Sequence, residues 1–195
     1  MRYPEITPNF LPADTPIKAA GGKKIAEIKD FWQWAYSNLI DNTVRGKLAE
    51  FLVACALGIE KAITQPGADF DLRSNEGVSI EVKTSGYIQA WGQNELSRLS
   101  FSIPQTHGWD GQTGKYSEEK KRQADVYVFC VHNHTVQETL NPLDVTQWDF
   151  YVLPTTVLNE KACDQRSIAL STVVALGAKK CTYELLHEEI QKYAR

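Results

Sequence analysis

Residues 67–86 read GADFDLRSNEGVSIEVKTSG, and this stretch predicts a β-hairpin. Asn75-Glu76-Gly77 suits a three-residue hairpin loop, whose last position needs a positive φ and therefore favours glycine. The loop sets the pairing of the two strands. Counting outward from it gives the pairs Ser74–Val78, Arg73–Ser79, Leu72–Ile80, Asp71–Glu81, Phe70–Val82 and Asp69–Lys83.

The two faces of this hairpin differ in chemistry, because side chains alternate along a strand. One face is apolar and should pack on the core: Phe70, Leu72, Val78, Ile80 and Val82. The other face is polar: Asp69, Asp71, Arg73, Ser79, Glu81 and Lys83. Directly opposed Cβ atoms lie roughly 4.5–5.5 Å apart, so Asp71 and Glu81 should be neighbours.

The polar face predicts a metal site. Two adjacent carboxylates repel each other unless a cation lies between them, and such oxygen ligands suit Mg²⁺ or Mn²⁺. Lys83 lies on the same face as Glu81, where it could orient or deprotonate a water molecule or stabilise negative charge. The alternatives are a solvent-exposed face of weak ion pairs and the carboxylate pair of a glycosidase, which Lys83 disfavours.

Helices are expected on both sides of the strands. Apolar spacing predicts a helix over residues 23–41, a buried helix over 43–57 that ends at Gly58, and an amphipathic helix over 182–194. Residues 1–22 hold four of the eight prolines and predict an irregular arm, which leaves 23–195 as one domain. The charged segment 117–123 predicts a short helix. Strands are expected at 69–74, 78–83, 97–103, 125–132 and 148–153.

Composition limits the binding partners and cellular locations that we expect for the chain. Its 195 residues carry a net charge of −3, so a polyanion would have to be held by a local patch. Apolar runs are too short for a membrane span, and the N-terminus lacks the pattern of a signal peptide. Four scattered cysteines indicate a reducing, cytoplasmic location. Gly21-Gly22-Lys23-Lys24 lacks phosphate-loop spacing, so no nucleotide cofactor is expected.

Asp71 followed by Glu81-Val82-Lys83 resembles the signature of the PD-(D/E)XK, or restriction-endonuclease-like, superfamily, whose usual proline is replaced here by Phe70. The resemblance covers residues 43–132. It implies an α/β fold with an αβββαβ core, in which helices flank a mixed sheet, plus an extra hairpin after Lys83 and a C-terminal helix. Asp69 is an alternative acid to Asp71.

The resemblance also implies an activity, that of a Mg²⁺- or Mn²⁺-dependent endonuclease that hydrolyses DNA. Asp71, Glu81 and the Val82 carbonyl would hold the metal, and Lys83 would act on the attacking water. Glu50, on the helix over 43–57, would be a further ligand; otherwise it reaches water or pairs with Lys47. A restriction, repair or mobile-element enzyme would fit, and cutting both strands would favour a homodimer. The alternative is an inactive module that binds nucleic acid or a protein.

Further side chains are candidates for substrate binding. Tyr87, Gln89 and Trp91 alternate after the metal-site strand, although the aromatic residues could equally pack in the core. Lys120, Lys121 and Arg122, with Lys115, form the densest basic cluster, which could follow a phosphate backbone or be a solvated helix face.

Overall fold

Strand β8 (Val126–His132) is the centre of the structure, since each of its seven residues is buried. The computed structural model describes the whole chain except residues 1–2, 4–5, 7, 65–67, 111–114 and 195. It divides into two compact units, Met1–Leu39 and Ile40–Arg195. The units divide after Leu39 and not after residue 22; the behaviour of residues 1–22 as a separate arm stays a prediction.

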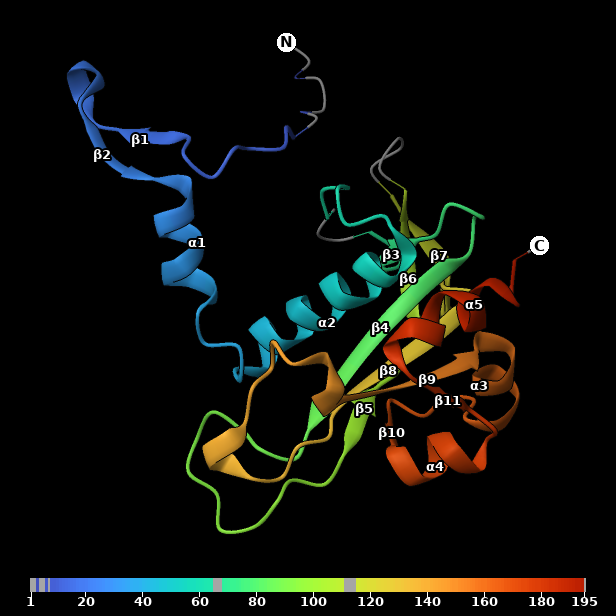
Figure 1. The fold of residues 1–195 in the computed structure, drawn as a ribbon. Helices are drawn as coiled ribbons and strands as arrows, with labels where there is room; N and C mark the ends of the chain where they lie inside the picture. Colours follow the sequence, from blue (N-terminus) through green and yellow to red (C-terminus); the bar gives the residue numbers. More distant parts are fainter. Residues whose placement is uncertain (1–2, 4–5, 7, 65–67, 111–114, 195) are drawn as a thin grey trace. The chain divides into compact units, whose positions relative to one another are not determined.

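The larger unit is built on a five-stranded mixed sheet in the order β11-β9-β8-β4-β3 (Figure 1). Its other strands are β3 (Leu72–Arg73), β4 (Ser79–Gly86), β9 (Trp148–Pro154) and β11 (Lys179–Cys181). Strand β4 runs parallel to β8, whereas the other neighbours are antiparallel. The predicted class, a mixed sheet flanked by helices, is confirmed.

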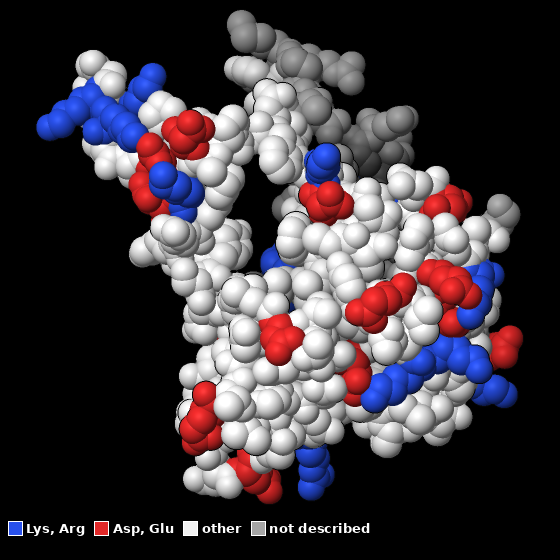
Figure 2. Space-filling model, viewed as in Figure 1, with Lys and Arg blue, Asp and Glu red and all other residues white. Residues whose placement is uncertain are grey.

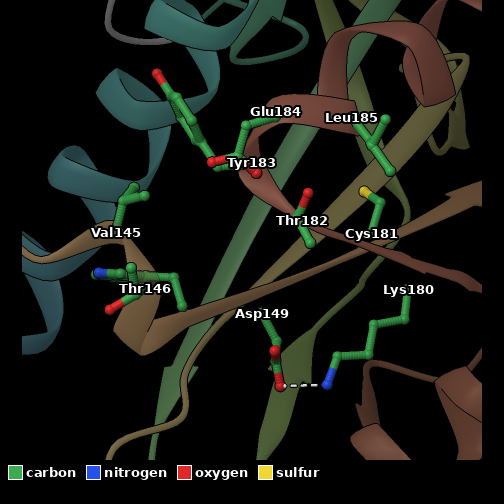
Figure 3. A pocket seen from close by; sticks show the side chains of 10 residues that line it. Val145, Thr146, Asp149, Lys180, Cys181, Thr182, Tyr183, Glu184 and Leu185 are labelled. Atoms are coloured by element: carbon green, nitrogen blue, oxygen red, sulfur yellow. Dashed lines mark ion pairs between the residues drawn. The ribbon is translucent and has the colours of Figure 1, made fainter.

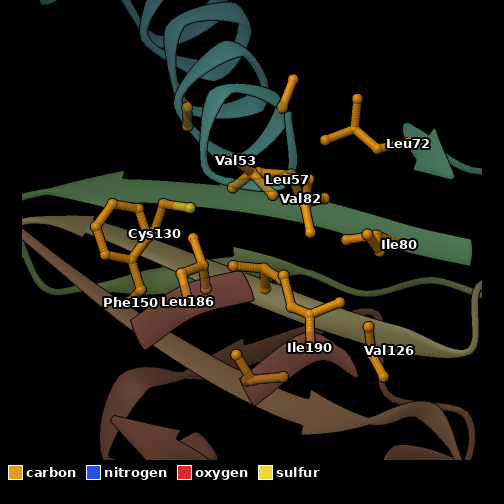
Figure 4. Packing of buried hydrophobic residues seen from close by; sticks show 14 of the residues in the cluster. Val53, Leu57, Leu72, Ile80, Val82, Val126, Cys130, Phe150, Leu186 and Ile190 are labelled. Atoms are coloured by element: carbon orange, nitrogen blue, oxygen red, sulfur yellow. The ribbon is translucent and has the colours of Figure 1, made fainter. Parts of the chain in front are cut away.

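Alternate residues of β8 face two different apolar clusters. Val126, Val128 and Cys130 pack beneath α2 (Asn42–Leu57) and α5 (Leu186–Gln191). Figure 4 shows this side, with Val53 and Leu57 of α2 close to Val82. On the other side, Tyr127, Phe129 and Val131 meet residues from the segments that cover that face. These are β5 (Ser100–Ser102), α3 (Thr155–Lys161), β10 (Ser167–Ala169) and α4 (Leu170–Ala175).

The connection from β4 to β8 differs from the expected core. It contains β5, β6 (Thr106–Asp110) and β7 (Lys115–Lys121), and the residues described there form no helix. The predicted helix over 117–123 is therefore wrong, because its first five residues belong to β7, which pairs antiparallel with β6. The extra hairpin exists, but it is formed by β6 and β7 and lies later in the chain than expected.

The ends of several helices follow from identifiable caps. The Asp41 carboxylate accepts hydrogen bonds from the amides of Thr43 (2.9 Å) and Val44 (3.3 Å), which starts α2. Gly58 ends α2 with φ 68°, as predicted. The predicted C-terminal helix exists as α5 but is shorter than 182–194 at both ends, and the 3₁₀ turn η4 (Tyr183–Leu185) precedes it. Further 3₁₀ turns are η2 (Gln137–Thr139) and η3 (Val145–Gln147).

The smaller unit contains a hairpin and a helix. Strands β1 (Pro16–Lys18) and β2 (Lys24–Glu27) pair antiparallel around the turn η1 (Ala20–Gly22), and α1 covers Ile28–Tyr36. The predicted helix over 23–41 is thus too long at both ends. Glu27 and Asp30 form a capping box that starts α1 only at residue 28, and residues 24–27 are a strand.

Two general features complete the fold. No helix in the described ranges is long and apolar enough to cross a membrane. All four cysteines are free thiols.

Candidate active site

The turn between β3 and β4 fixes the register on which the site depends. Gly77 has φ 90°, and its amide donates to the Ser74 carbonyl (3.0 Å). The Ser74 amide donates to the Val78 carbonyl (2.9 Å), and Leu72 and Arg73 face Ile80 and Ser79. The predicted three-residue turn and these pairs are confirmed.

Asp71 ends the ladder instead of continuing it. Its amide donates to the Ile80 carbonyl (3.1 Å), and its carboxylate Oδ2 accepts the Val82 amide (2.8 Å). The side chain thereby occupies the position of a backbone acceptor, and β3 begins only at Leu72. The predicted strand over 69–71 and the pairs Phe70–Val82 and Asp69–Lys83 are therefore wrong. Because a backbone amide holds it, the Asp71 carboxylate is fixed beside β4.

Glu81 and Lys83 lie together on one face of β4. The Lys83 ammonium donates to Glu81 Oε1 at 2.5 Å, and the two side chains are 25% and 20% exposed. Ile80 and Val82, which alternate with them, are buried in the cluster beneath α2. The Lys83 side chain is thus partly accessible to solvent.

The pKa of the Glu81 carboxyl is raised above its usual value. Burial is the main cause, and the negative charge of Asp71 adds to it, whereas Lys83 opposes it. Glu50 contributes a further small repulsion. The carboxylates of Asp71, Glu81 and Glu50 therefore act on one another here, and Lys83 offsets part of their charge at Glu81.

Glu50 reaches the site from α2. Its carboxylate forms an ion pair with Lys47 (2.7 Å), the partner expected for a merely structural glutamate. Burial raises its pKa, the nearby Asp71 charge raises it further, and Lys83 acts in the opposite direction. Glu50 is thus close enough to Asp71 and Lys83 to interact with both.

A pocket of about 280 Å³ connects Glu50 with Asp71. Its remaining wall comes mainly from apolar residues of α2 and the following segment, including Phe51, Ile59 and Ile63. Phe70 and Arg73 close it near β3, with the Arg73 guanidinium 4.6 Å from the centre of the Phe70 ring. Phe70 therefore lies at this pocket and not in the core, contrary to the prediction.

Asp69, the alternative acid, is used elsewhere. Its Oδ1 accepts the Trp109 amide of β6 at 2.6 Å. This contact turns the carboxylate towards the β6–β7 hairpin, and the ion pair of Glu81 is formed with Lys83. The geometry favours Asp71 over Asp69 as the acid beside Glu81.

The three residues that follow β4 occupy different surroundings. Tyr87 packs against the apolar cluster on the α3 side of the sheet. Gln89 accepts from the Arg45 guanidinium (3.1 Å) and donates to the Gly86 carbonyl (2.8 Å). Trp91 is 58% exposed. The structure gives Trp91 a free surface and gives Tyr87 and Gln89 internal contacts.

Arg45 is a buried charged residue at the C-terminal end of β4 that the sequence did not reveal. It is buried in α2, and its Nη1 donates to the Ile88 carbonyl (3.0 Å), which ties the loop after β4 to the helix. Gly86 lies against it, since a Cβ there would be 2.7 Å from Arg45 Nη1. An arginine in the first turn of a helix usually faces water, so only its distant partners identify it as buried.

The basic cluster separates into exposed and buried members. Lys120 and Lys121 are exposed on β7. Arg122 is buried, and its guanidinium donates to the carbonyls of Ile103 (3.0 Å), Cys163 (2.9 Å) and Gln165 (3.2 Å). Arg122 also donates to Asn159 (3.0 Å). It is therefore a structural residue, and its predicted contact with substrate has no support.

A larger pocket, of about 510 Å³, contains none of the predicted residues. Figure 3 shows Asp149 and Lys180 on its wall, joined by an ion pair of 2.8 Å, with Cys181 and Thr182 nearby. Its lining also holds the acid Glu184, which Figure 3 shows beside Tyr183 and apart from Asp149. The candidate site therefore remains at β4.

Comparison with known proteins adds one finding. A family model described as bacteriophage T4 endonuclease IV matches residues 26–172, which include Glu50, Asp71, Glu81 and Lys83. No curated protein matches the chain.

Proposed function

The chain belongs to the bacteriophage T4 endonuclease IV family, and on that premise we propose that it is a nuclease that hydrolyses DNA with a divalent metal held by Asp71 and Glu81, beside Lys83. One observation carries the assignment of the site. The Asp71 carboxylate is held by the Val82 amide beside Glu81, which is in turn paired with Lys83. The two carboxylates and the amine are thus brought together by β4 and by the residue just before β3, an arrangement that resembles the PD-(D/E)XK signature.

The donor set fits a metal of the magnesium type. Among the described residues no group of three or more His, Cys, Asp or Glu side chains could hold a metal alone. Mg²⁺ usually takes only one or two carboxylates and completes its shell with water and substrate phosphate. Asp71 and Glu81, with the Val82 carbonyl, would supply the protein ligands. When bound, the ion polarises the scissile phosphate and lowers the pKa of an attacking water.

Lys83 and Glu50 would act around these ligands. The Lys83 ammonium, now hydrogen-bonded to Glu81, is placed to orient the water and to stabilise negative charge as the phosphate is attacked. Glu50 would accept a hydrogen bond from metal-bound water, or bind a second ion, from across the pocket that it shares with Asp71.

Lys83→Ala tests the assignment. We expect cleavage of plasmid DNA with Mg²⁺ or Mn²⁺ to fall by at least about 100-fold, the size of a lost general acid-base or electrostatic contribution, with folding unchanged. Lys180→Ala is the matched control, because it also removes a lysine paired with a carboxylate. Unchanged cleavage by Lys83→Ala would refute the site. DNA binding without metal-dependent cleavage by the wild-type chain would instead indicate an inactive binding module.

A homodimer remains part of the proposal, because one site per chain cuts one strand at a time. Gel filtration with light scattering at several concentrations measures the oligomer directly. A monomer at all concentrations that still makes double-strand breaks would remove this part of the proposal.

A further inference from the structure

The β6–β7 hairpin stands apart from the main sheet. Its strands pair only with each other in the described part of the chain, and every residue of β7 is exposed. Figure 1 shows the hairpin at the end of the sheet where β3 lies. A two-stranded ribbon in water is marginally stable by itself, so its attachment to the domain determines its position.

The hairpin is attached through the segment that carries the proposed metal ligand. Asp69, two residues before Asp71, accepts the Trp109 amide at 2.6 Å. Gly108 allows this close approach, since a Cβ there would lie 3.2 Å from Asp69 Oδ2. Gln123 adds a hydrogen bond to the Thr106 carbonyl (3.0 Å) at the base of the hairpin. The hairpin and the Asp71 carboxylate are therefore held in a defined relation.

The hairpin exposes two aromatic rings. Trp109 and Tyr116 face each other across the strands, with ring centres 4.7 Å apart and planes inclined at 56°. Trp109 is 41% exposed and Tyr116 68% exposed, and neither belongs to an apolar cluster. An exposed aromatic pair on a protruding ribbon offers planar surface to a partner and contributes little to the core.

Exposed lysines lie near this pair and could contact phosphates, although acids are interspersed with them. Lys115, Lys120 and Lys121 are exposed on β7, together with the acids Glu118 and Glu119. The chain as a whole carries a charge of −3. Lysines interleaved with aromatic rings are typical of proteins that bind the phosphates and bases of a nucleic acid.

We propose that Trp109 and Tyr116 form a base-stacking platform, which binds a nucleobase of the DNA close to the phosphate that is cleaved. The inference rests on the proposed function for the identity of the substrate. Stacking on an aromatic ring is possible for every base, so the platform provides affinity and position and little sequence preference. Lys115 and Lys120 hold the adjoining phosphates. Asp69 is then a positioning residue, which sets the distance from the platform to Asp71.

Equilibrium binding separates the platform from the chemistry. A fluorescein-labelled DNA oligonucleotide, single-stranded and as a duplex, is titrated with the full chain in EDTA, so that no cleavage occurs. We expect Trp109→Ala and Tyr116→Ala each to weaken binding by about tenfold, within the range found for lost base stacking. Trp109→Phe should restore most of the affinity. Trp34→Ala, which removes an exposed tryptophan from the smaller unit, is the control.

An abasic scan identifies the contact as stacking. One nucleotide at a time is replaced by an abasic unit, and one position should weaken wild-type binding about tenfold while leaving Trp109→Ala unaffected. The proposal would be overturned if each abasic position weakened binding equally in the wild-type chain and in Trp109→Ala. Wild-type affinity in both alanine variants would also overturn it, as would failure of the wild-type chain to bind DNA. If Trp109→Ala folds normally and loses DNA binding, the platform is supported even when Lys83→Ala still cleaves DNA. The platform and the metal site can therefore be refuted independently.

Discussion

Glu81 shows at the scale of one residue how the fold creates the site. Burial and the Asp71 charge disfavour its ionised form, so its pKa in the folded chain lies above the ordinary 4.5. Between pH 4.5 and the raised pKa, the folded state therefore binds more protons than the unfolded state. The contribution of Glu81 to stability is complete below about pH 4.5 and is lost as the pH rises through the raised pKa.

This linkage predicts the effect of Glu81→Gln. We expect the variant to have a higher Tm than wild type at pH 7, by about 2–4 °C for each kcal/mol of relieved repulsion, and a similar Tm at pH 4. Thermal unfolding followed by circular dichroism at the two pH values measures the difference. A variant less stable than wild type at pH 7 would mean that the ion pair with Lys83 outweighs the burial.

Arg122 gives a second test at the residue scale. Arg122→Ala removes four hydrogen bonds of a buried guanidinium, and we expect a loss of at least about 3 kcal/mol in the free energy of unfolding. Lys121→Ala, at the neighbouring exposed position, should stay within about 0.5 kcal/mol of wild type. Urea denaturation provides both values. A stable Arg122→Ala chain would contradict the structural role.

The sequence predicted Asp71, Glu81 and Lys83 as a group because a turn of known length determines the register by counting. It did not predict the use of Asp69 by the Trp109 amide, since that contact joins residues far apart in the chain. The burial of Arg45 and Arg122 depends in the same way on distant carbonyl groups. Local patterns therefore predicted that Asp71, Glu81 and Lys83 lie close together, and they missed contacts between residues far apart in the chain.

At the scale of elements, the sequence predicts strands that have one apolar face or a continuous apolar run, but it does not predict exposed strands made of polar residues. The alternating faces of β4 and the apolar run of β8 were recognised correctly. The sequence of β7, KYSEEKK, consists largely of good helix formers, and its pairing with β6 overrides that preference. Similarly, the sequence predicts a helix at β2 because Ile25 is at helical spacing from Ile28.

The β3–β4 turn offers a prediction at this scale. Gly77→Ala places a Cβ at φ 90°, where an L-residue is strained, and we expect a loss of about 1–2 kcal/mol in stability. Gly92→Ala is the matched control, because Gly92 has no positive φ and no atom within 4 Å of its Cβ position. Urea denaturation distinguishes the two. Equal stability of both variants would contradict the strained φ assigned to position 77.

At the scale of the molecule, Met1–Leu39 and Ile40–Arg195 are distinct units. The larger one contains both apolar clusters and all the proposed metal ligands. Lysines gather on the β1–β2 hairpin of the smaller unit, whereas acids and bases are interspersed on the face of the larger unit in Figure 2. The family match, residues 26–172, includes parts of both.

This division predicts that a chain of residues 40–195 folds independently. Its Tm should lie within a few degrees of that of the full chain, where 1 kcal/mol corresponds to roughly 2–4 °C. The reason is that, among the described residues, none before Leu48 belongs to either apolar cluster, and Leu48 is only partly buried against one of them. Calorimetry of both chains measures this. A truncated chain without a cooperative transition would show that the smaller unit is needed for folding.

Metal binding at Asp71 and Glu81 is the central claim, and calorimetric titration of the full chain with Mn²⁺ tests it most directly. The account predicts a saturable heat in the wild-type chain that is lost in Asp71→Asn and Glu81→Gln and retained in Asp149→Asn, which alters the larger pocket. An identical heat in all four proteins, or none in the wild type with DNA present, would contradict it.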